Sequence, residues 1–582
     1  MSLVLPAVRV RLSHDDLLMR GGVVLLVVVL LGMVGLPLWS LLAKGFEDRD
    51  GHFVGLANYA AYFSTPALSN SVLNSFQVAA VCTLIVVPLA FLYAYALTRA
   101  VLPLRWLFQG VALIPIFAPS LLPGLALIYL FGNQGFLKAW LGGGQIYGFE
   151  GIVLAQVFYC FPHATLILVT ALATADARLY EAADALGASK LRVFLTVTLP
   201  GAKYGVISAA LVVFTLVITD FGVAKVIGGN FNVLATDVYK QVIGQQNFSM
   251  GAVVGMVLLA PAALAFAVDR VVQRKQVALL TARAVPLIPR PNLARDLVFT
   301  LFCVAVSAGI FLILGMAAWG SLIKYWPYNL SLTWANYKFE TFDANGWNSY
   351  YNSLAMATGA AIFGTTLTFV GAWLTEKTRG FFLLRDLVRF LAFLPMAVPG
   401  LVLGLGYIFF FNAPANPLNF LYATMAILVI NTVAHFYTVG HLTATTALKQ
   451  IDPEFEAVSA SLKVPVWRTL ARVTAPICLP SILDIAIYLF VNAMTTVSSV
   501  IFLYSPDTKL AAVAALNIEE AGTTAAAAAL CMVIVLTSAA VKALHLLADR
   551  FLLRRLQAAT ARTNRKRWLP AFIRIWSPRR RS

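Results

Sequence analysis

Long apolar runs separated by short polar segments dominate the sequence. A helix needs about 20 mostly apolar residues to cross the hydrocarbon layer of a membrane. By that measure the two halves of the chain carry the same number of candidate spans. We place them at 21–43, 72–98, 106–131, 150–173, 204–228, 250–271, 297–322, 352–375, 386–411, 420–447, 479–503 and 524–548. The pattern predicts an all-α membrane protein with about 12 transmembrane helices.

The second set of spans repeats the first. Short motifs recur in the same order and at a nearly constant offset along the chain, at these pairs of positions: Asn58-Tyr59 and Asn336-Tyr337, Asn74-Ser75 and Asn352-Ser353, Pro115 and Pro395, Pro119 and Pro399. A parallel duplication of this kind predicts two six-helix units related by a pseudo-two-fold axis along the membrane normal.

The repeat divides the chain into four parts. We expect a first six-helix unit at 1–275 and a second at 297–550. The segment 276–296 contains three prolines and is typical of a linker. The last part, 551–582, is rich in Lys and Arg and is expected to be a basic tail.

The net charge of +18 raises the question of nucleic acid, but its distribution favours a membrane. If the N-terminus is cytoplasmic, only eight of the 43 Lys and Arg residues fall in outer segments. They are Lys44, Arg49, Lys138, Lys225, Lys240, Lys324, Lys338 and Lys509. Cytoplasmic segments are enriched in such residues, so we expect both termini and the linker inside, a lipid bilayer as partner and no nucleic acid.

Two short polar segments lie between the fourth and fifth spans of each half. Asp176 and Asp452 precede them and can accept hydrogen bonds from the free amides of a first helical turn. Pro453 suits the first position of a helix, where an N–H is not needed. The segments predict helices at about 177–187 and 453–463.

Each short helix is expected to carry an apolar stripe. Gly187 suits the left-handed residue that ends a helix, whereas the second helix has Lys463 there and must stop before Pro465. Residues at i, i+3, i+4 and i+7 share one face. They are Leu179, Ala182, Ala183 and Leu186 in the first copy and Phe455, Val458, Ser459 and Leu462 in the second.

A helix of this length is about 15 Å long, too short to cross a bilayer and marginally stable alone in water. The simpler interpretation is that each helix lies against the inner ends of its own bundle. The occurrence of the same capped stripe twice instead favours two equivalent partners.

The chain has no phosphate-binding loop of the G-x-x-x-x-G-K-[ST] type. We therefore do not expect the chain to bind ATP by that route. We also expect no catalytic, cofactor-binding or metal-binding residues in it and no enzyme activity. One alternative is a secondary transporter driven by an ion gradient, for which Asp484 is a further candidate carboxylate. Asp220 is either an interfacial carboxylate paired with Lys225 or a pathway residue, and Asn492 is the second possible pathway residue.

The first short helix resembles the EAA motif of the permease subunits of bacterial ATP-binding cassette (ABC) importers. The residues that match the motif are Glu181, Ala182, Ala183, Gly187, Leu199 and Pro200. The second copy departs from the motif, because Glu456 falls one position early relative to Glu181 and Lys463 replaces the glycine. One residue turns a side chain by about 100° on a helix, which puts an identical role for the two glutamates in doubt.

The resemblance implies two tandem type I (MetI-like) permease units in the bacterial inner membrane. It also implies two copies of a separate cytoplasmic ABC ATPase, which binds the ATP, and a periplasmic solute-binding protein. The coupling helices that would dock on the ATPase carry the following expected contact residues: Asp176, Leu179, Glu181, Ala182, Ala183, Leu186, Gly187, Asp452, Phe455, Glu456, Val458, Leu462 and Lys463.

The fused arrangement of two units is similar to ferric-iron permeases and, more closely, to permeases of 2-aminoethylphosphonate importers. The similar stretches are 214–255, 393–412 and 488–517. The resemblance implies 2-aminoethylphosphonate as the first candidate substrate and ferric iron as the second.

Overall fold

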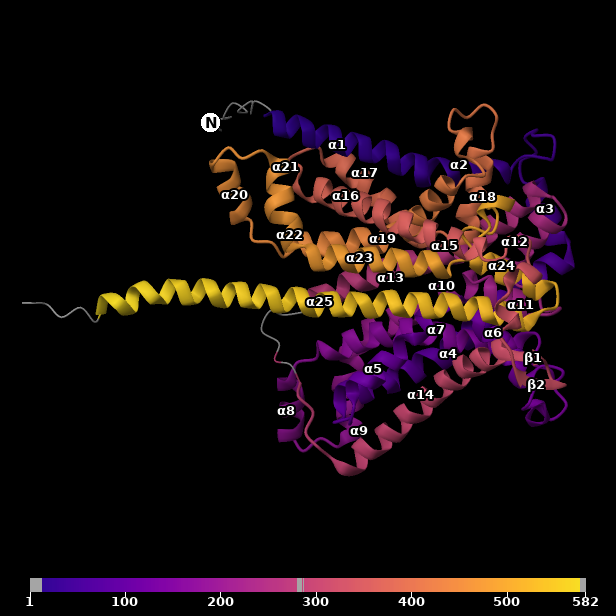
Figure 1. The fold of residues 1–582 in the computed structure, drawn as a ribbon, viewed down its shortest axis with the longest axis horizontal. Helices are drawn as coiled ribbons and strands as arrows, with labels where there is room; N and C mark the ends of the chain where they lie inside the picture. Colours follow the sequence, from indigo (N-terminus) through magenta and orange to yellow (C-terminus); the bar gives the residue numbers. More distant parts are fainter. Residues whose placement is uncertain (1–12, 280–284, 286, 576–582) are drawn as a thin grey trace, which may run out of the picture.

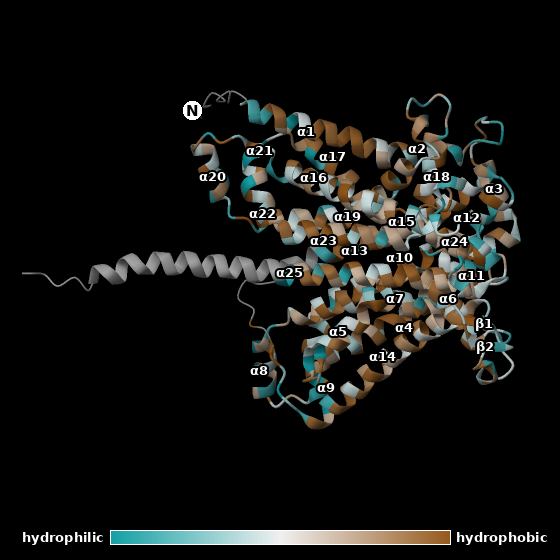
Figure 2. Cartoon of the chain, in the orientation of Figure 1, coloured by the Kyte–Doolittle hydropathy of each residue, from teal (hydrophilic) through white to brown (hydrophobic). Residues whose placement is uncertain are grey.

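The computed structural model describes residues 13–279, 285 and 287–575. In these residues nine helices are long and apolar enough to cross a membrane, and three bent pairs of helices bring the total to as many as twelve. Figure 2 shows apolar residues along the bundle and polar residues gathered toward its two ends. The prediction of an all-α membrane protein with about twelve spans is confirmed.

The described residues of the first half form thirteen α-helices (Figure 1). They are α1 (His14–Leu30), α2 (Leu36–Lys44), α3 (Ala57–Ser64), α4 (Pro66–Arg99), α5 (Arg105–Leu113), α6 (Leu121–Phe131), α7 (Phe149–Ala173), α8 (Ala177–Ala185), α9 (Lys190–Val193), α10 (Leu199–Thr219), α11 (Gly222–Ile227), α12 (Leu234–Tyr239) and α13 (Phe248–Leu279).

In the second half, the residues that the structure describes form twelve α-helices and a two-stranded antiparallel sheet. The elements are α14 (Leu293–Leu322), β1 (Ile323–Tyr325), β2 (Asn329–Leu332), α15 (Asn348–Gly359), α16 (Thr365–Lys377), α17 (Phe382–Phe393), α18 (Gly400–Phe411), α19 (Met425–Lys449), α20 (Glu454–Ser461), α21 (Val466–Thr469), α22 (Ala475–Ile477), α23 (Leu479–Thr495), α24 (Ala511–Glu520) and α25 (Thr524–Ile575).

Two predicted spans, 106–131 and 386–411, are sharply bent. The first turns by 99° between Phe117 and Leu121, and the second turns by 117° between Ala397 and Gly400. Pro119 and Pro399 lie at these breaks, and proline has no N–H with which to continue the helical hydrogen bonds. The repeated prolines noted in the sequence therefore mark bends within the spans.

The fifth spans also differ from the predicted boundaries. Residues 204–219 of the predicted span 204–228 belong to a longer helix over Lys190–Thr219, and α11 follows this helix as a separate element. In the second half α23 ends at Thr495, so residues 496–503 are not helical. The helix before α23 bends by 77° near Cys478, where Leu479-Pro480 begins a new helix.

The first span of each half packs against the other half. Helices α1 and α2 contact α16, α17 and α18, while α14 contacts α4, α5 and α6 (Figure 1). Gly406 allows the close approach of α18 to α2, because a Cβ there would lie 2.6 Å from the Pro37 carbonyl oxygen. The two halves are thus joined by exchanged first spans.

A buried hydrogen bond supports this exchange. Pro37 has no N–H, so the carbonyl oxygen of Met33 lacks its usual helical donor four residues later. The Tyr407 hydroxyl donates to that oxygen at 2.7 Å from the opposite half. A carbonyl in hydrocarbon needs such a partner, because no water is present to supply one.

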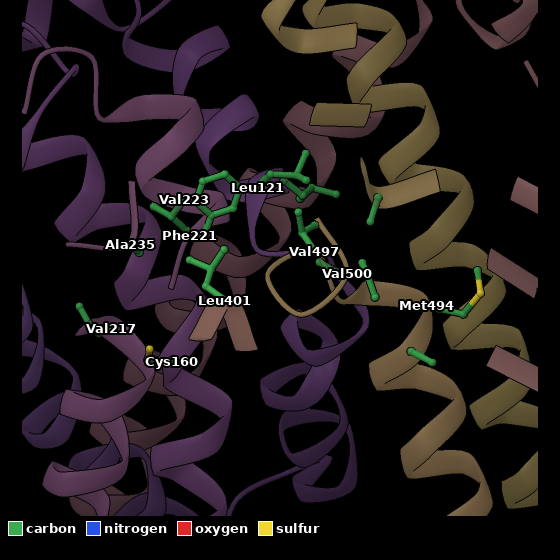
Figure 3. Packing of buried hydrophobic residues seen from close by; sticks show 14 of the residues in the cluster. Leu121, Cys160, Val217, Phe221, Val223, Ala235, Leu401, Met494, Val497 and Val500 are labelled. Carbon is green, nitrogen blue, oxygen red and sulfur yellow. The ribbon is translucent and has the colours of Figure 1, made fainter. Parts of the chain in front are cut away.

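The short helices α8 and α20 lie at one end of the bundle, and α11, α12 and α24 lie at the other (Figure 1). The α11–α24 end is closed by contacts between the halves. Figure 3 shows Leu121, Phe221 and Val223 of the first half near Leu401, Val497 and Val500 of the second, all in the buried core. Lys225 of α11 also forms an ion pair with Glu520 of α24, with Nζ and Oε1 2.5 Å apart.

We expect Tyr407→Phe to lower the thermal unfolding temperature, because it leaves the Met33 carbonyl without a donor. Hydrogen bonds between membrane helices are worth about 0.5–2 kcal/mol, which corresponds to a shift of a few degrees. The melt is measured by intrinsic fluorescence of the protein in detergent. Tyr328→Phe is the matched control, since its hydroxyl contacts Gln134 in an exposed position. Equal unfolding temperatures of the two variants would contradict a stabilising role for the hydrogen bond from Tyr407 to Met33.

Candidate functional site: two paired surface helices

Asp176 begins α8 as the sequence predicts. Its Oδ1 accepts a hydrogen bond from the Arg178 amide at 3.1 Å. The Arg178 guanidinium donates to both carboxylate oxygens, which lowers the pKa of Asp176 to about 2. The residue is therefore charged at neutral pH and stabilises the positive end of the helix.

The linker before the second half also contacts the start of α8. The Ala177 amide donates to the Val285 carbonyl oxygen at 2.8 Å, and the Val285 amide donates to Asp176 Oδ1 at 3.3 Å. Backbone groups of the linker thus form hydrogen bonds with the first residue of α8 and with its N-cap. This contact positions α8 relative to α14.

Tyr180 fixes α8 to the bundle. Its hydroxyl donates to Thr198 Oγ1 at 3.1 Å, and the Arg99 guanidinium lies over its ring, 5.3 Å from the centroid. Arg99 is the last residue of α4 and also donates to the Leu172 carbonyl oxygen at 2.9 Å. Sequence reasoning missed Tyr180, although an aromatic ring outside the apolar stripe of a short polar helix was a signal for this contact.

Gly187 ends α8 with a φ of +69°, as its position predicts. The amide of Ala188 donates to the Ala183 carbonyl oxygen and the amide of Gly187 donates to the Asp184 carbonyl oxygen, both at 3.0 Å. These bonds satisfy carbonyl groups that have no partner within the helix.

The predicted apolar stripe of α8 points largely away from the bundle. Leu179 is 59% exposed and Leu186 is 86% exposed. Glu181 and Ala182 are exposed as well, and Ala183 is half-buried. Two exposed leucines on one short helix are a surface on which another protein can dock.

Helix α20 reproduces this arrangement in the second half. The Asp452 side chain accepts from the Glu454 amide at 3.0 Å, although the helix begins one residue later than predicted, with Pro453 at its N-cap. Its predicted stripe is also exposed: 49% for Phe455, 56% for Val458 and 70% for Leu462. Both helices therefore offer apolar side chains at the same end of the bundle (Figure 1).

The start of α1 contacts the segment after α20. Asp15 Oδ2 accepts from the Val466 amide at 3.1 Å, a contact between residues 451 positions apart. This amide lies at the start of α21, where a carboxylate is favourable. Each short helix is thus positioned by the segment that enters the first span of the opposite half.

Glu456 has a different environment from Glu181. Glu456 Oε1 lies 2.5 Å from Lys377 Nζ, which fixes α20 to the end of α16. At the offset that relates Asp176 to Asp452, Glu456 matches Tyr180, and Ala457 matches Glu181. The one-residue shift in the motif therefore places Glu456 in the position that holds the helix to the bundle.

Lys463 takes the left-handed conformation that Gly187 takes in α8. Its φ is +53°, and the Val464 amide donates to the Ser459 carbonyl oxygen at 2.9 Å. The turn that ends the helix is thus the same in both copies. A residue with a Cβ is strained by about 1–2 kcal/mol in this region.

The two possible pathway residues have local partners. Asp220 Oδ2 accepts from Gln156 Nε2 and from the Val223 amide, each at 2.9 Å. The expected pairing of Asp220 with Lys225 is wrong, because Lys225 binds Glu520 of the other half.

Asp220 corresponds in the repeat to Thr496, whose hydroxyl is 2.9 Å from that of Ser499. Both side chains stabilise the turn after the fifth span. Asn492 is half-buried and donates to the Tyr488 carbonyl oxygen of its own helix at 2.8 Å. Among the described residues, no hydrogen bond joins Asp220 to Asn492.

The duplicated bundle with its two exposed helices is typical of a membrane transport subunit that contains two six-helix repeats. The family model "Binding-protein-dependent transport system inner membrane component" matches residues 86–277 and 367–553. The chain belongs to this family, and it is an inner-membrane permease of a binding-protein-dependent ABC importer.

Two similar proteins are ferric transport system permeases. FbpB 1 of Haemophilus influenzae is 28% identical over 450 residues, covering 73% of this chain and 69% of that protein. FbpB of Actinobacillus pleuropneumoniae is 28% identical over 462 residues, covering 75% of this chain and 65% of that protein. The molybdenum permease ModB of Escherichia coli is 31% identical over 156 residues, which are 26% of this chain and 68% of ModB.

This family membership answers the question of class left open by the sequence. An importer of this family works with an ATPase and a binding protein, which excludes the alternative of a transporter driven only by an ion gradient. The family members are permease subunits without an ATPase site of their own.

We expect Lys463→Gly to slow hydrogen exchange at the amides that close α20, because glycine relieves the strain at positive φ. Relief of about 1 kcal/mol corresponds to roughly fivefold slower exchange at Val464. Gly187→Lys in α8 is the reciprocal control and is expected to speed exchange at Ala188. Faster exchange at Val464 in Lys463→Gly would contradict the explanation. The measurement is hydrogen–deuterium exchange with mass spectrometry.

Proposed function

We propose that this chain is the translocation subunit of an ATP-driven importer in which α8 and α20 are the docking points for two copies of the ATPase. The observation that carries the proposal is the pair of exposed apolar stripes at one end of the bundle. Each stripe offers two or three large side chains. Complete burial of one such side chain contributes about 1.5–3 kcal/mol.

The anchoring contacts support the transmission of force from these helices. Tyr180 with Arg99, and Glu456 with Lys377, hold the faces of α8 and α20 that are turned toward the bundle. The opposite faces are left for a partner. A displacement of the ATPase subunits is in this way passed to the ends of α4 and α16.

The proposed cycle begins from the arrangement described here. The α11–α24 end is closed by contacts between the halves, while α8 and α20 lie on opposite sides of the other end (Figure 1). Closure of the ATPase dimer on ATP would bring α8 and α20 together. The halves would then separate at the α11–α24 end and admit the solute.

The charge distribution supports an orientation with α8, α20 and both termini in the cytoplasm. The Lys and Arg residues assigned to outer segments belong to elements of the α11–α24 end, such as Lys44 at the end of α2, Lys225 of α11 and Lys324 of β1. The remaining cations are the majority, as expected for the cytoplasmic side. The α11–α24 end would then receive the solute from the periplasmic binding protein.

For the substrate, we propose 2-aminoethylphosphonate, on the strength of the sequence resemblance over 214–255, 393–412 and 488–517. Ferric iron is the second candidate, and the two similar ferric permeases favour it. Both substrates are compatible with a permease that receives its solute from a selective binding protein.

To test docking, we would replace Leu186 and Leu462 with Asp. Burial of each of these side chains contributes about 1.5–3 kcal/mol, so each substitution should lower affinity for the ATPase by about 10- to 140-fold. The measurement is co-purification and titration of the ATPase with the permease in nanodiscs. Leu332→Asp is the control, because it is similarly exposed, at 67%, on β2 at the opposite end. Wild-type affinity in the double variant would refute the docking surface.

To test the substrate, the permease is reconstituted with its ATPase and binding protein, and ATP-dependent uptake of labelled 2-aminoethylphosphonate and of ferric iron is measured in parallel. We expect uptake of the phosphonate that disappears without ATP or without the binding protein. Uptake of ferric iron alone would assign the second candidate. Transport of either solute without the ATPase would contradict the whole mechanism.

A further inference from the structure

Asp484, His545 and Asp549 form a compact cluster between the fifth and sixth spans of the second half. His545 Nε2 lies 3.1 Å from Asp484 Oδ1 and 3.2 Å from Asp549 Oδ2. His545 and Asp549 are four residues apart and share a face of α25, while Asp484 comes from α23. The His545 side chain is 2% exposed, so its nitrogen is held in place against both carboxylates.

The first half has a cluster at the equivalent positions, but a carboxylate lies at its centre and neutral hydrogen-bond donors lie on either side. Ser208, Asp269 and Gln273 match Asp484, His545 and Asp549 at the same offset that relates α8 to α20. There the central residue is the carboxylate: Ser208 donates to Asp269 Oδ1 and Gln273 donates to Oδ2, both at 2.6 Å. Each oxygen of Asp269 has its own donor, so this cluster is complete without a ligand.

The cluster of the second half is not complete in this way. Two carboxylates meet one nitrogen, which carries at most one hydrogen, so that hydrogen must be shared. Among the residues whose side chains the structure describes, which in α25 end at Arg550, no Lys or Arg forms an ion pair with Asp484 or Asp549. Two neighbouring carboxylates repel each other, and a cation bound between them removes that repulsion.

The distances suit a metal ion. An ion bound at about 2.0–2.2 Å in tetrahedral or octahedral geometry keeps neighbouring ligand atoms about 3.0–3.5 Å apart. The observed separations of 3.1 and 3.2 Å fall in this range, and all three ligand atoms lie within 4.8 Å of one another. One imidazole and two carboxylates are suitable ligands for Zn²⁺, Mn²⁺ or Fe²⁺.

The cluster is also open to solvent on one side. The Asp484 side chain is 55% exposed and that of Asp549 is 29% exposed. Asp484 lies in the second turn of α23, toward the end of the bundle that carries α20. An ion could enter from that side and keep water in its remaining positions.

We propose that Asp484, His545 and Asp549 bind a divalent transition-metal ion and thereby join α23 to α25. The site is separate from the docking surfaces of α8 and α20. It depends neither on the identity of the transported solute nor on the orientation in the membrane. Affinity should follow the usual order for such ligands, with Zn²⁺ bound more tightly than Mn²⁺.

The test is Zn²⁺ binding to the purified full-length chain without an affinity tag, measured by equilibrium dialysis and metal analysis. All variants carry His52→Gln, because Asp48, Asp50 and His52 form a second, exposed group of possible ligands. We expect about one Zn²⁺ per chain and a higher melting temperature with Zn²⁺. His545→Gln should weaken binding by about 100-fold and abolish the thermal shift.

A designed control covers the case in which His545→Gln does not fold. The triple variant Asp484→Ser, His545→Asp, Asp549→Gln installs the cluster of the first half, which is complete without a metal. It should fold and lose Zn²⁺ binding, whereas Asp269→Asn in the first half should keep it. Equal Zn²⁺ binding by the triple variant, or no Zn²⁺ binding by the parent chain, would overturn the proposal.

Discussion

The exchange of first spans between the halves is the contact on which the rest of the arrangement depends. Lipid and apolar side chains are alike in polarity, so membrane helices associate through close packing and hydrogen bonds rather than through the hydrophobic effect. The approach of α18 to α2 at Gly406 and the bond from Tyr407 to Met33 supply both. Because α1 lies against the second half, its Asp15 reaches the segment after α20. The linker before α14 reaches α8 for the same reason. The exchange therefore holds both short helices in place.

The number of spans, the duplication and the two short helices could be predicted from the sequence, because each depends on local composition. Apolar length identifies a span, and Asp176 and Gly187 mark the ends of a helix by their own chemistry. The turns at Pro119 and Pro399 were harder to predict, since proline is tolerated inside many membrane helices, as Pro88 and Pro162 show here. Only the packing around each proline decides between a tolerated residue and a bend.

Contacts between distant residues were beyond sequence reasoning. Lys225 lies five residues from Asp220 in the chain, but its partner Glu520 comes from the other half. In the cluster of Asp484, His545 and Asp549, only the last two have a helical spacing, and Asp484 comes from another helix 61 residues before His545. The repeat offered one unused signal. Comparison of the two halves position by position pairs Tyr180 with Glu456, while Arg99 and Lys377 end the second spans of the two halves. This comparison would have predicted an anchoring contact in each half.

The two fifth spans differ in a way that has a mechanical consequence. Behind α8, the helix over Lys190–Thr219 is continuous, whereas behind α20 the corresponding helix turns by 77° at Cys478. A straight helix transmits a displacement along its axis. A bent helix converts part of the same displacement into rotation of the segment beyond the bend. Equal strokes at α8 and α20 would therefore produce unequal movements in the core of the bundle. The pseudo-two-fold symmetry of the chain thus does not extend to the shape of its fifth spans, and force applied at the two short helices would be transmitted differently.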